Sequence, residues 1–257
     1  MICVYDSGVG GLTTLLALRK ALPDADILYL GDTARVPYGS RSSDTVVKYA
    51  ASALDCLAAY RPEAVLVACG TVSTVALPTL APRYPFPIVG VAEAGARAAL
   101  DAAPNGRIAV LATEATVRSG YFRERITALC ERAEVREIAC QLFVALAECG
   151  FSSEEDPIPA LVCERYLAPL FEDPPEAILL GCTHFPWLLP HITRLFPEAL
   201  TVDAGRAAVS SLCARVEGKG GGRTEYRVTD SPRDFSLRHR ALTGAIPAGR
   251  VEKVLLE

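Results

Sequence analysis

Two similar stretches decide the fold: residues 61 to 71 read RPEAVLVACGT, and residues 174 to 184 read PPEAILLGCTH. Each has a turn-forming proline, a four-residue apolar run of strand length, and a cysteine where the run meets a polar loop. In an open α/β sheet, ligands bind at the carboxyl ends of the strands. The repeat therefore predicts two related α/β units that present Cys69 and Cys182 in equivalent positions, one on each side of a small substrate.

Composition excludes several classes of partner. Of the 257 residues, 51% are hydrophobic, and the net charge is −4 without a run of basic residues. This balance argues against an extended disordered chain, and against nucleic acid or an anionic membrane surface as a partner. The longest apolar stretches are shorter than the roughly 20 residues of a membrane span. The N-terminus enters a strand pattern at once, without a basic region followed by a long apolar one. These features predict a cytoplasmic protein.

Cysteine is frequent, with nine residues against three histidines, and no two cysteines form a Cys-x-x-Cys pair. In an intracellular chain such cysteines are expected to be free thiols, most of them small buried hydrophobic residues. Neither a disulfide framework nor a structural zinc site is expected. Only Cys69 and Cys182 combine the end of a strand with a polar loop.

The first strand, Ile2 to Tyr5, leads into Asp6-Ser7-Gly8-Val9-Gly10-Gly11 and then into a helical pattern. This turn lacks the third glycine of a dinucleotide-binding motif, so a nucleotide is not the expected ligand. Asp6 and Ser7 instead lie at a strand end beside a helix N-terminus, where backbone N–H groups can hold a carboxylate.

Further along, the loop from Gly31 to Ser40 holds Tyr38 on a stiff turn with its ring free. This tyrosine is either a half-exposed surface residue or part of the site. A single helix is predicted from Val117 to Arg132. Two α/β lobes of similar design account for the alternation of strands and helices.

Two facing thiols could invert a stereocentre without a cofactor, because one thiolate can remove a proton while the opposite thiol delivers one. We expect a helix N-terminus to lower the pKa of both thiols. His184 could act on the proton of Cys182, and Asp6 could do the same at Cys69. A Cys-His nucleophile of the hydrolase type is a competing interpretation, but it leaves the repeat unexplained.

Five segments resemble the glutamate racemases in their order and spacing. They are Asp6 to Gly11, Gly31 to Gly39, Ala68 to Thr71, Thr113 to Thr116, and Gly181 to Pro186. The resemblance implies cofactor-independent interconversion of L- and D-glutamate, which supplies D-glutamate to peptidoglycan. It also implies two α/β lobes with the site between them, a first lobe of residues 1–95 plus 207–257 and a second of residues 96–206. A homodimer is compatible with it.

The same resemblance implies a role for each site residue. Cys69 and Cys182 match the two acid/base thiols, while Asp6, His184 and Glu148 match the residues that tune them. The positions that match substrate-binding residues are Asp6, Ser7, Tyr38, Gly39, Gly70, Thr71, Thr116, Thr183 and His184.

One position departs from the family inside the site, because Gly70 stands where the family has an asparagine that contacts the substrate. We expect the glycine to leave a small space, and the loss of a hydrogen bond to a charged group to cost about 1.5 to 3 kcal/mol. Three hypotheses follow: a glutamate racemase, a racemase with another amino-acid substrate such as aspartate, or a binding protein that has lost turnover.

Overall fold

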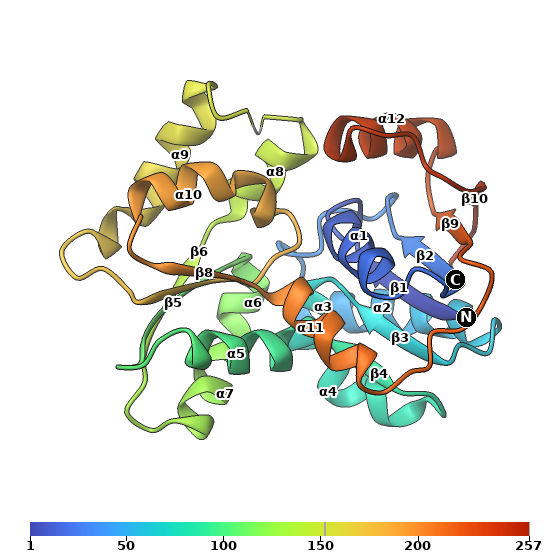
Figure 1. Cartoon of the computed structure of the whole chain (residues 1–257), viewed down its shortest axis with the longest axis horizontal. Helices are drawn as coiled ribbons and strands as arrows, with labels where there is room; N and C mark the ends of the chain where they lie inside the picture. The colour runs from blue at the N-terminus through green and yellow to red at the C-terminus, as the bar shows by residue number, and fades with distance from the viewer. Residues whose placement is uncertain (152, 257) are drawn as a thin grey trace.

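Two parallel sheets, one of six strands and one of four, organise the computed structural model, which describes residues 1–151 and 153–256 (Figure 1). The larger sheet has the order β10-β9-β2-β1-β3-β4. Its strands are β1 (Ile2–Asp6), β2 (Ile27–Gly31), β3 (Ala64–Val67), β4 (Ile88–Gly90), β9 (Thr224–Val228) and β10 (Val251–Lys253). The smaller sheet has the order β6-β5-β7-β8. Its strands are β5 (Arg107–Ala112), β6 (Glu134–Ala139), β7 (Ala177–Leu180) and β8 (Leu200–Asp203).

Helices flank both sheets, which is the arrangement expected when parallel strands are buried on both faces. In the first half of the chain they are α1 (Leu12–Ala21), α2 (Ser43–Ala58), α3 (Gly70–Val75), α4 (Leu77–Leu80), η1 (Ala81–Arg83), α5 (Val91–Asp101), α6 (Glu114–Ser119) and α7 (Tyr121–Leu129). In the second half they are α8 (Gln141–Glu148), α9 (Pro157–Leu167), η2 (Ala168–Leu170), η3 (Phe185–Leu188), α10 (Leu189–Leu195), α11 (Ala204–Cys213) and α12 (Pro232–Thr243).

The strand order β2-β1-β3-β4 of the first sheet recurs as β6-β5-β7-β8 in the second. Within this repeat, β3 and β7 occupy equivalent places, and the side chains of both are buried along their whole length. Cys69 and Cys182 each follow the last residue of their strand by two positions. The repeated sequence pattern thus corresponds to a repeated topology, with a cysteine at the same end of each unit.

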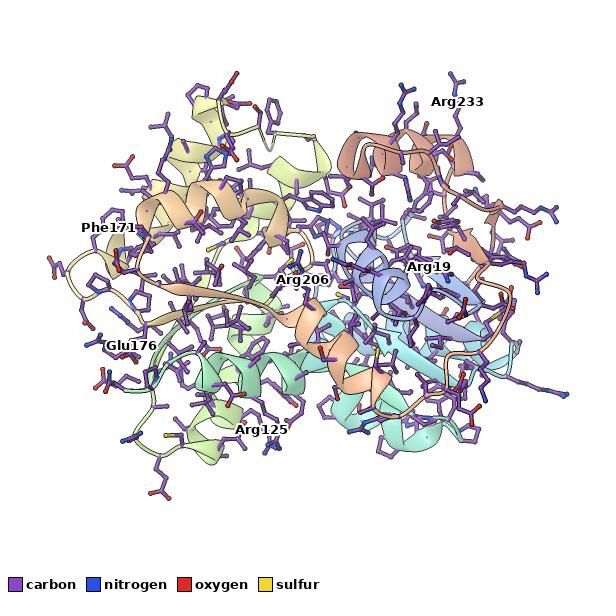
Figure 2. All side chains as sticks on the ribbon, in the orientation of Figure 1. Arg19, Arg125, Phe171, Glu176, Arg206 and Arg233 are labelled. Carbon is purple, nitrogen blue, oxygen red and sulfur yellow. The ribbon has the colours of Figure 1, made fainter. Side chains whose placement is uncertain are left out.

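The chain crosses between the sheets twice. It leaves the first sheet through α5, and it returns from the second through α11; the two helices pack against each other (Figure 1). One hydrophobic cluster runs from Val4 of the first sheet through Ala96 and Ala208 to Leu179 of the second. The labelled charged side chains of Arg125, Glu176 and Arg233 lie at the periphery instead (Figure 2). We propose that the lobes divide inside these two helices, near residues 95 and 207.

The prediction of a single helix from Val117 to Arg132 is wrong. This stretch consists of two helices, α6 and α7, which meet at Gly120. Gly120 has a φ of 68°, a left-handed conformation that glycine adopts without steric cost and that ends a helix. Periodicity on both sides of the glycine is helical, so the sequence pattern concealed the break.

The crossing of α5 and α11 depends on a close approach at Gly95, where an added Cβ would lie 2.9 Å from the Cβ of Ala204. We expect Gly95→Leu to lower the free energy of unfolding by about 1–3 kcal/mol, because the larger side chain forces the helices apart. Urea titration measures this change. Ala98→Leu, at a half-exposed position of the same helix, is the matched control. Equal unfolding midpoints for the two variants would contradict the importance of this crossing.

Candidate active site

Cys69 lies at the N-cap of α3, in the loop that follows β3, and its side chain is buried. The hydroxyl of Ser7 donates a hydrogen bond to its sulfur over 3.3 Å. Burial, followed by the nearby charge of Asp6, raises the pKa of the Cys69 thiol to about 12. The expectation that a helix terminus lowers this pKa is therefore wrong for Cys69, because desolvation of the thiolate outweighs the helix terminus. At neutral pH, Cys69 is a thiol.

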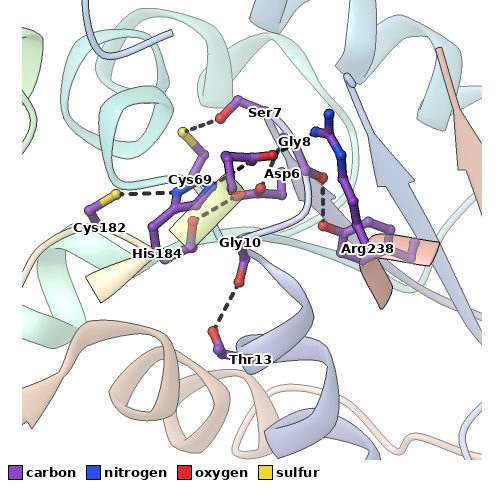
Figure 3. A network of polar contacts seen from close by, with 12 residues as sticks. Asp6, Ser7, Gly8, Gly10, Thr13, Cys69, Cys182, His184 and Arg238 are labelled. Atoms are coloured by element: carbon purple, nitrogen blue, oxygen red, sulfur yellow. Dashed lines mark hydrogen bonds and ion pairs between the residues drawn. The ribbon is translucent and has the colours of Figure 1, made fainter. Parts of the chain in front are cut away.

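Cys182 has a different partner, because its sulfur lies 3.6 Å from Nδ1 of His184 (Figure 3). Nε2 of the same ring lies 2.8 Å from Oε1 of Glu148. Burial would lower the pKa of His184, but the hydrogen bonds to Cys182 and Glu148 raise it well above its ordinary value. A protonated His184 places a positive charge beside the Cys182 sulfur.

Asp6 lies at the end of β1 and is fully buried. Its carboxylate accepts hydrogen bonds from the backbone N–H of Gly8 at 3.0 Å and from the hydroxyl of Thr183 at 3.3 Å. Burial raises the pKa of Asp6, while the charge of His184 and the nearby backbone N–H groups oppose that rise. Asp6 therefore connects the two lobes through Thr183, and Ser7 rather than Asp6 is the direct partner of the Cys69 thiol.

Three threonine hydroxyls from both lobes form a buried cluster. Thr71 and Thr113 lie 2.9 Å apart through their hydroxyl oxygens, and the Thr113 hydroxyl donates to that of Thr116 over 3.0 Å. Thr113 is the N-cap of α6, where its oxygen accepts from the backbone N–H of Thr116. Sequence reasoning did not select Thr113 as a site residue, although its position at the end of β5 was the available signal.

Tyr38 is buried, so its ring is not free as expected, and of the two interpretations the half-exposed surface residue is wrong. Its hydroxyl donates a hydrogen bond to the carboxylate of Asp32, and the hydroxyl of Tyr5 donates to Tyr38 over 3.2 Å. Burial, together with the neighbouring acidic groups, raises the pKa of Tyr38. The ring still lines the cavity between the cysteines, and Asp32 is the missed residue that fixes its orientation.

Gly70 does not leave the small space that the sequence predicted. A Cβ at this position would overlap the carbonyl oxygen of Gly181, the residue before Cys182. The two cysteine loops therefore meet backbone to backbone, and Gly181 fills the space beside Gly70. The lobes also approach closely at Gly39, where an added Cβ would lie 2.6 Å from the Cβ of Thr113.

Both cysteines line one cavity of about 20 Å³ between the lobes. Its lining comprises Ser7, Val36, Pro37, Tyr38, Gly39, Cys69, Gly70, Thr71, Thr113, Val144, Cys182, Thr183 and His184. Three further predicted site residues lie behind this lining and hydrogen-bond to it. Asp6 bonds to Thr183, Thr116 to Thr71, and Glu148 to His184. Such a cavity has room for about one water molecule, so any larger ligand requires the lobes to separate.

A larger hollow of about 710 Å³ lies beside α1 and α11, lined by residues that include Thr13, Trp187 and Arg206. It does not contain the paired thiols, so chemistry rather than volume identifies the site. Over residues 1–151 and 153–256, no group of three or more His, Cys, Asp or Glu side chains is placed to hold a metal ion. No helix in this described part of the chain has the length and apolar character to cross a membrane.

Two repeated α/β lobes with a thiol from each in a shared cavity define a class of amino-acid racemase. A family model, Asp/Glu/Hydantoin racemase, matches residues 14–212, and the chain belongs to this family.

A glutamate racemase from Aquifex aeolicus is 39% identical over 243 residues, which cover 95% of this chain and 94% of that protein. Among solved structures, glutamate racemase from Bacillus anthracis matches with a TM-score of 0.92 at 28% identity, covering 100% of this chain and 97% of that one. Glutamate racemase from Francisella tularensis, in complex with D-glutamate, matches with a TM-score of 0.91 at 30% identity, with the same coverage. These comparisons confirm the resemblance and the α/β fold class.

The raised pKa of His184 predicts a pH dependence of stability. A group whose pKa is raised by folding contributes fully below its unfolded value, about 6.5, and loses this contribution as pH rises through the folded value. We therefore expect the free energy of unfolding to fall above pH 6.5, by at most about 1.4 kcal/mol per pH unit from this group. Urea titrations between pH 6 and 8.5 measure the slope. Glu148→Gln removes one cause of the raised His184 pKa and should reduce the slope of stability against pH. An unchanged slope would contradict the raised pKa of His184 as its cause.

Proposed function

We propose that the protein interconverts L- and D-glutamate without a cofactor, using Cys69 and Cys182 as the two acid/base groups. The observation that carries the proposal is the placement of both sulfurs in one cavity, each at the end of an equivalent strand of a different sheet. Family membership and the 39% identity to the Aquifex aeolicus glutamate racemase support the choice of reaction and of substrate.

The proposed reaction begins with Cys182 as a thiolate and Cys69 as a thiol. The Cys182 thiolate removes the α-proton, leaving the electron pair on the α-carbon, and the Cys69 thiol donates its own proton to the opposite face. The product has the inverted configuration, Cys69 is now the thiolate, and the reverse reaction uses the two groups in exchanged roles. The Ser7 hydroxyl, which already donates to the Cys69 sulfur, stabilises the thiolate formed there.

Polar groups on the cavity lining are proposed to bind the substrate's carboxylates and amine. They are Ser7, Tyr38, Gly39, Gly70, Thr71, Thr183 and His184, with Asp6 and Thr116 acting from behind. At Gly70 only backbone groups are available. The Francisella tularensis glutamate racemase was solved in complex with D-glutamate, which supports an amino-dicarboxylic acid as the ligand here. We further propose that the protein is cytoplasmic and that its D-glutamate is used in peptidoglycan synthesis. Assembly of two copies into a homodimer stays a prediction.

Exchange of the α-proton tests the proposed reaction. In deuterated water, the protein should incorporate deuterium at the α-carbon of both L- and D-glutamate while interconverting them. Cys69→Ala and Cys182→Ala should each lower the racemisation rate by about 10²- to 10⁴-fold, the usual contribution of a general acid or base. Nuclear magnetic resonance and circular dichroism follow exchange and inversion separately.

Three results would count against this assignment. The absence of exchange from either enantiomer of glutamate by the folded protein would leave two hypotheses, a racemase for another amino acid and a binding protein. Thermal stabilisation by a ligand without proton exchange would support the binding protein. Faster exchange of aspartate or another amino acid, measured over a panel, would keep the mechanism and change the substrate. Full activity in either alanine variant would exclude the two-thiol mechanism.

Gly70 gives a second test of the site. We expect Gly70→Ala to lower kcat/KM by about 10- to 100-fold, because its Cβ would push the two cysteine loops apart and displace both thiols. Gly70→Asn, which restores the family's amide, should also lose activity for the same steric reason. Gly221→Ala is the control, since its Cβ would meet other atoms no closer than 3.8 Å. A gain of activity in Gly70→Asn would show that the loops separate easily.

A further inference from the structure

The carboxylate of Glu148 is held from two sides. Oε1 lies 2.8 Å from Nε2 of His184, and Oε2 accepts a hydrogen bond from Nη1 of Arg238 over 2.7 Å (Figure 3). Glu148 is the last residue of α8, and Arg238 lies in α12. A continuous polar chain therefore runs from a partly exposed guanidinium through Glu148 and His184 to the sulfur of Cys182.

Arg238 belongs structurally to the first lobe. Phe235 and His239, one turn apart on α12, pack against Tyr226 of β9 with ring centroids 5.6 and 5.7 Å away. Phe235 also contacts the ring of Tyr29 in β2. This buried face anchors α12 to the six-stranded sheet, and Arg238 projects from a neighbouring position on the same turn.

Glu148 belongs to the second lobe. The buried side of α8 includes Phe143, whose ring packs against Phe185 with centroids 5.2 Å apart. Figure 1 shows α12 beside the end of α8, on the opposite side of the molecule from the α5–α11 crossing. The Arg238–Glu148 ion pair thus joins the two lobes away from the covalent crossings, where separation of the lobes would be largest.

We propose that Arg238 is a positioning residue that holds the two lobes closed and fixes the Glu148 carboxylate that orients His184. This proposal rests on the proposed two-thiol reaction for its effect on turnover, but its effect on lobe closure is independent of any activity. Arg238 does not reach the cavity itself; it acts through Glu148 and His184.

The charges around Glu148 support this role. His184, Arg238, the carboxylate of Asp6 and the hydroxyl of Tyr29 all lie close enough to interact with it. Burial would raise the pKa of Glu148, but His184 and Arg238 outweigh burial and hold it below its ordinary value. Loss of the guanidinium should raise this pKa, so Glu148 would become protonated, and release His184, at a higher pH than in the parent protein.

Three variants on one helix test the proposal. Arg238→Ala removes the ion pair, and Arg238→Lys keeps the positive charge on a shorter side chain. Arg233→Ala is the matched control, because Arg233 points outward from α12 and makes no ion pair among the described residues (Figure 2). Each is compared with the parent in the glutamate exchange assay from pH 5.5 to 9. Alkylation of individual cysteines by iodoacetamide is followed in parallel by mass spectrometry.

Arg238→Ala is expected to lower kcat by about tenfold, because a less well-held His184 misplaces the Cys182 sulfur. The fall of kcat at acid pH should begin at a higher pH in Arg238→Ala than in the parent. Arg238→Lys should recover part of the lost kcat and part of the shift in the pH profile. Cys69 and Cys182 should both be alkylated about three to five times faster, because the loss of one partly exposed ion pair makes opening easier. Arg233→Ala should match the parent in every measurement.

Equal kcat, pH profile and alkylation rates in Arg238→Ala and Arg233→Ala would overturn the proposal. Faster alkylation of Cys182 alone would also overturn the proposal that Arg238 holds the lobes closed, since opening of the lobes must expose both thiols. If the parent protein exchanges no glutamate, the proposed reaction fails, while the alkylation comparison still decides whether Arg238 closes the lobes. Should Arg238→Ala not fold, Arg238→Gln keeps most of the side chain without its charge and is held to the same outcomes.

Discussion

The site depends on a contact between two stretches of backbone. Gly70 of one cysteine loop lies against the carbonyl of Gly181 in the other, at a distance that excludes any side chain at position 70. Cys69 and Cys182 are the immediate sequence neighbours of these two glycines, so the contact sets how far apart the sulfurs lie. A shared hydrophobic cluster and the α5–α11 crossing hold the lobes at this separation.

Equivalent topology does not give the thiols equivalent chemistry. Cys69 is buried beside a neutral hydroxyl and near the Asp6 carboxylate, which favours the protonated form. Cys182 lies beside His184, whose ring is held by a carboxylate, and this favours a positive charge next to the sulfur. A reaction that needs one acid and one base at the start thus finds two unlike thiols, although the repeat that places them is nearly symmetrical.

Much of the fold was predictable because it follows from local patterns. Four-residue apolar runs such as those before Cys69 and Cys182 are typical of strands buried on both faces, and both runs form internal strands of their sheets. The break at Gly120 was missed because helical periodicity continues across it. The environments of Tyr38 and Gly70 were also mispredicted, because each is set by a residue distant in sequence, Asp32 for the ring and Gly181 for the glycine. Arg238 carried no local signal, since an arginine on an amphipathic helix is usually a solvated charge.

The cavity of about 20 Å³ between the thiols has a thermodynamic consequence. A conformation this closed cannot admit an amino acid, so only the open fraction of molecules can bind one. The measured dissociation constant then equals the intrinsic constant divided by that fraction, and each tenfold decrease in the open population weakens apparent affinity tenfold. Contacts that hold the lobes this closed therefore oppose binding from solution. The apparent affinity for an amino acid is thus set by the opening equilibrium of the lobes as well as by the contacts that the site makes.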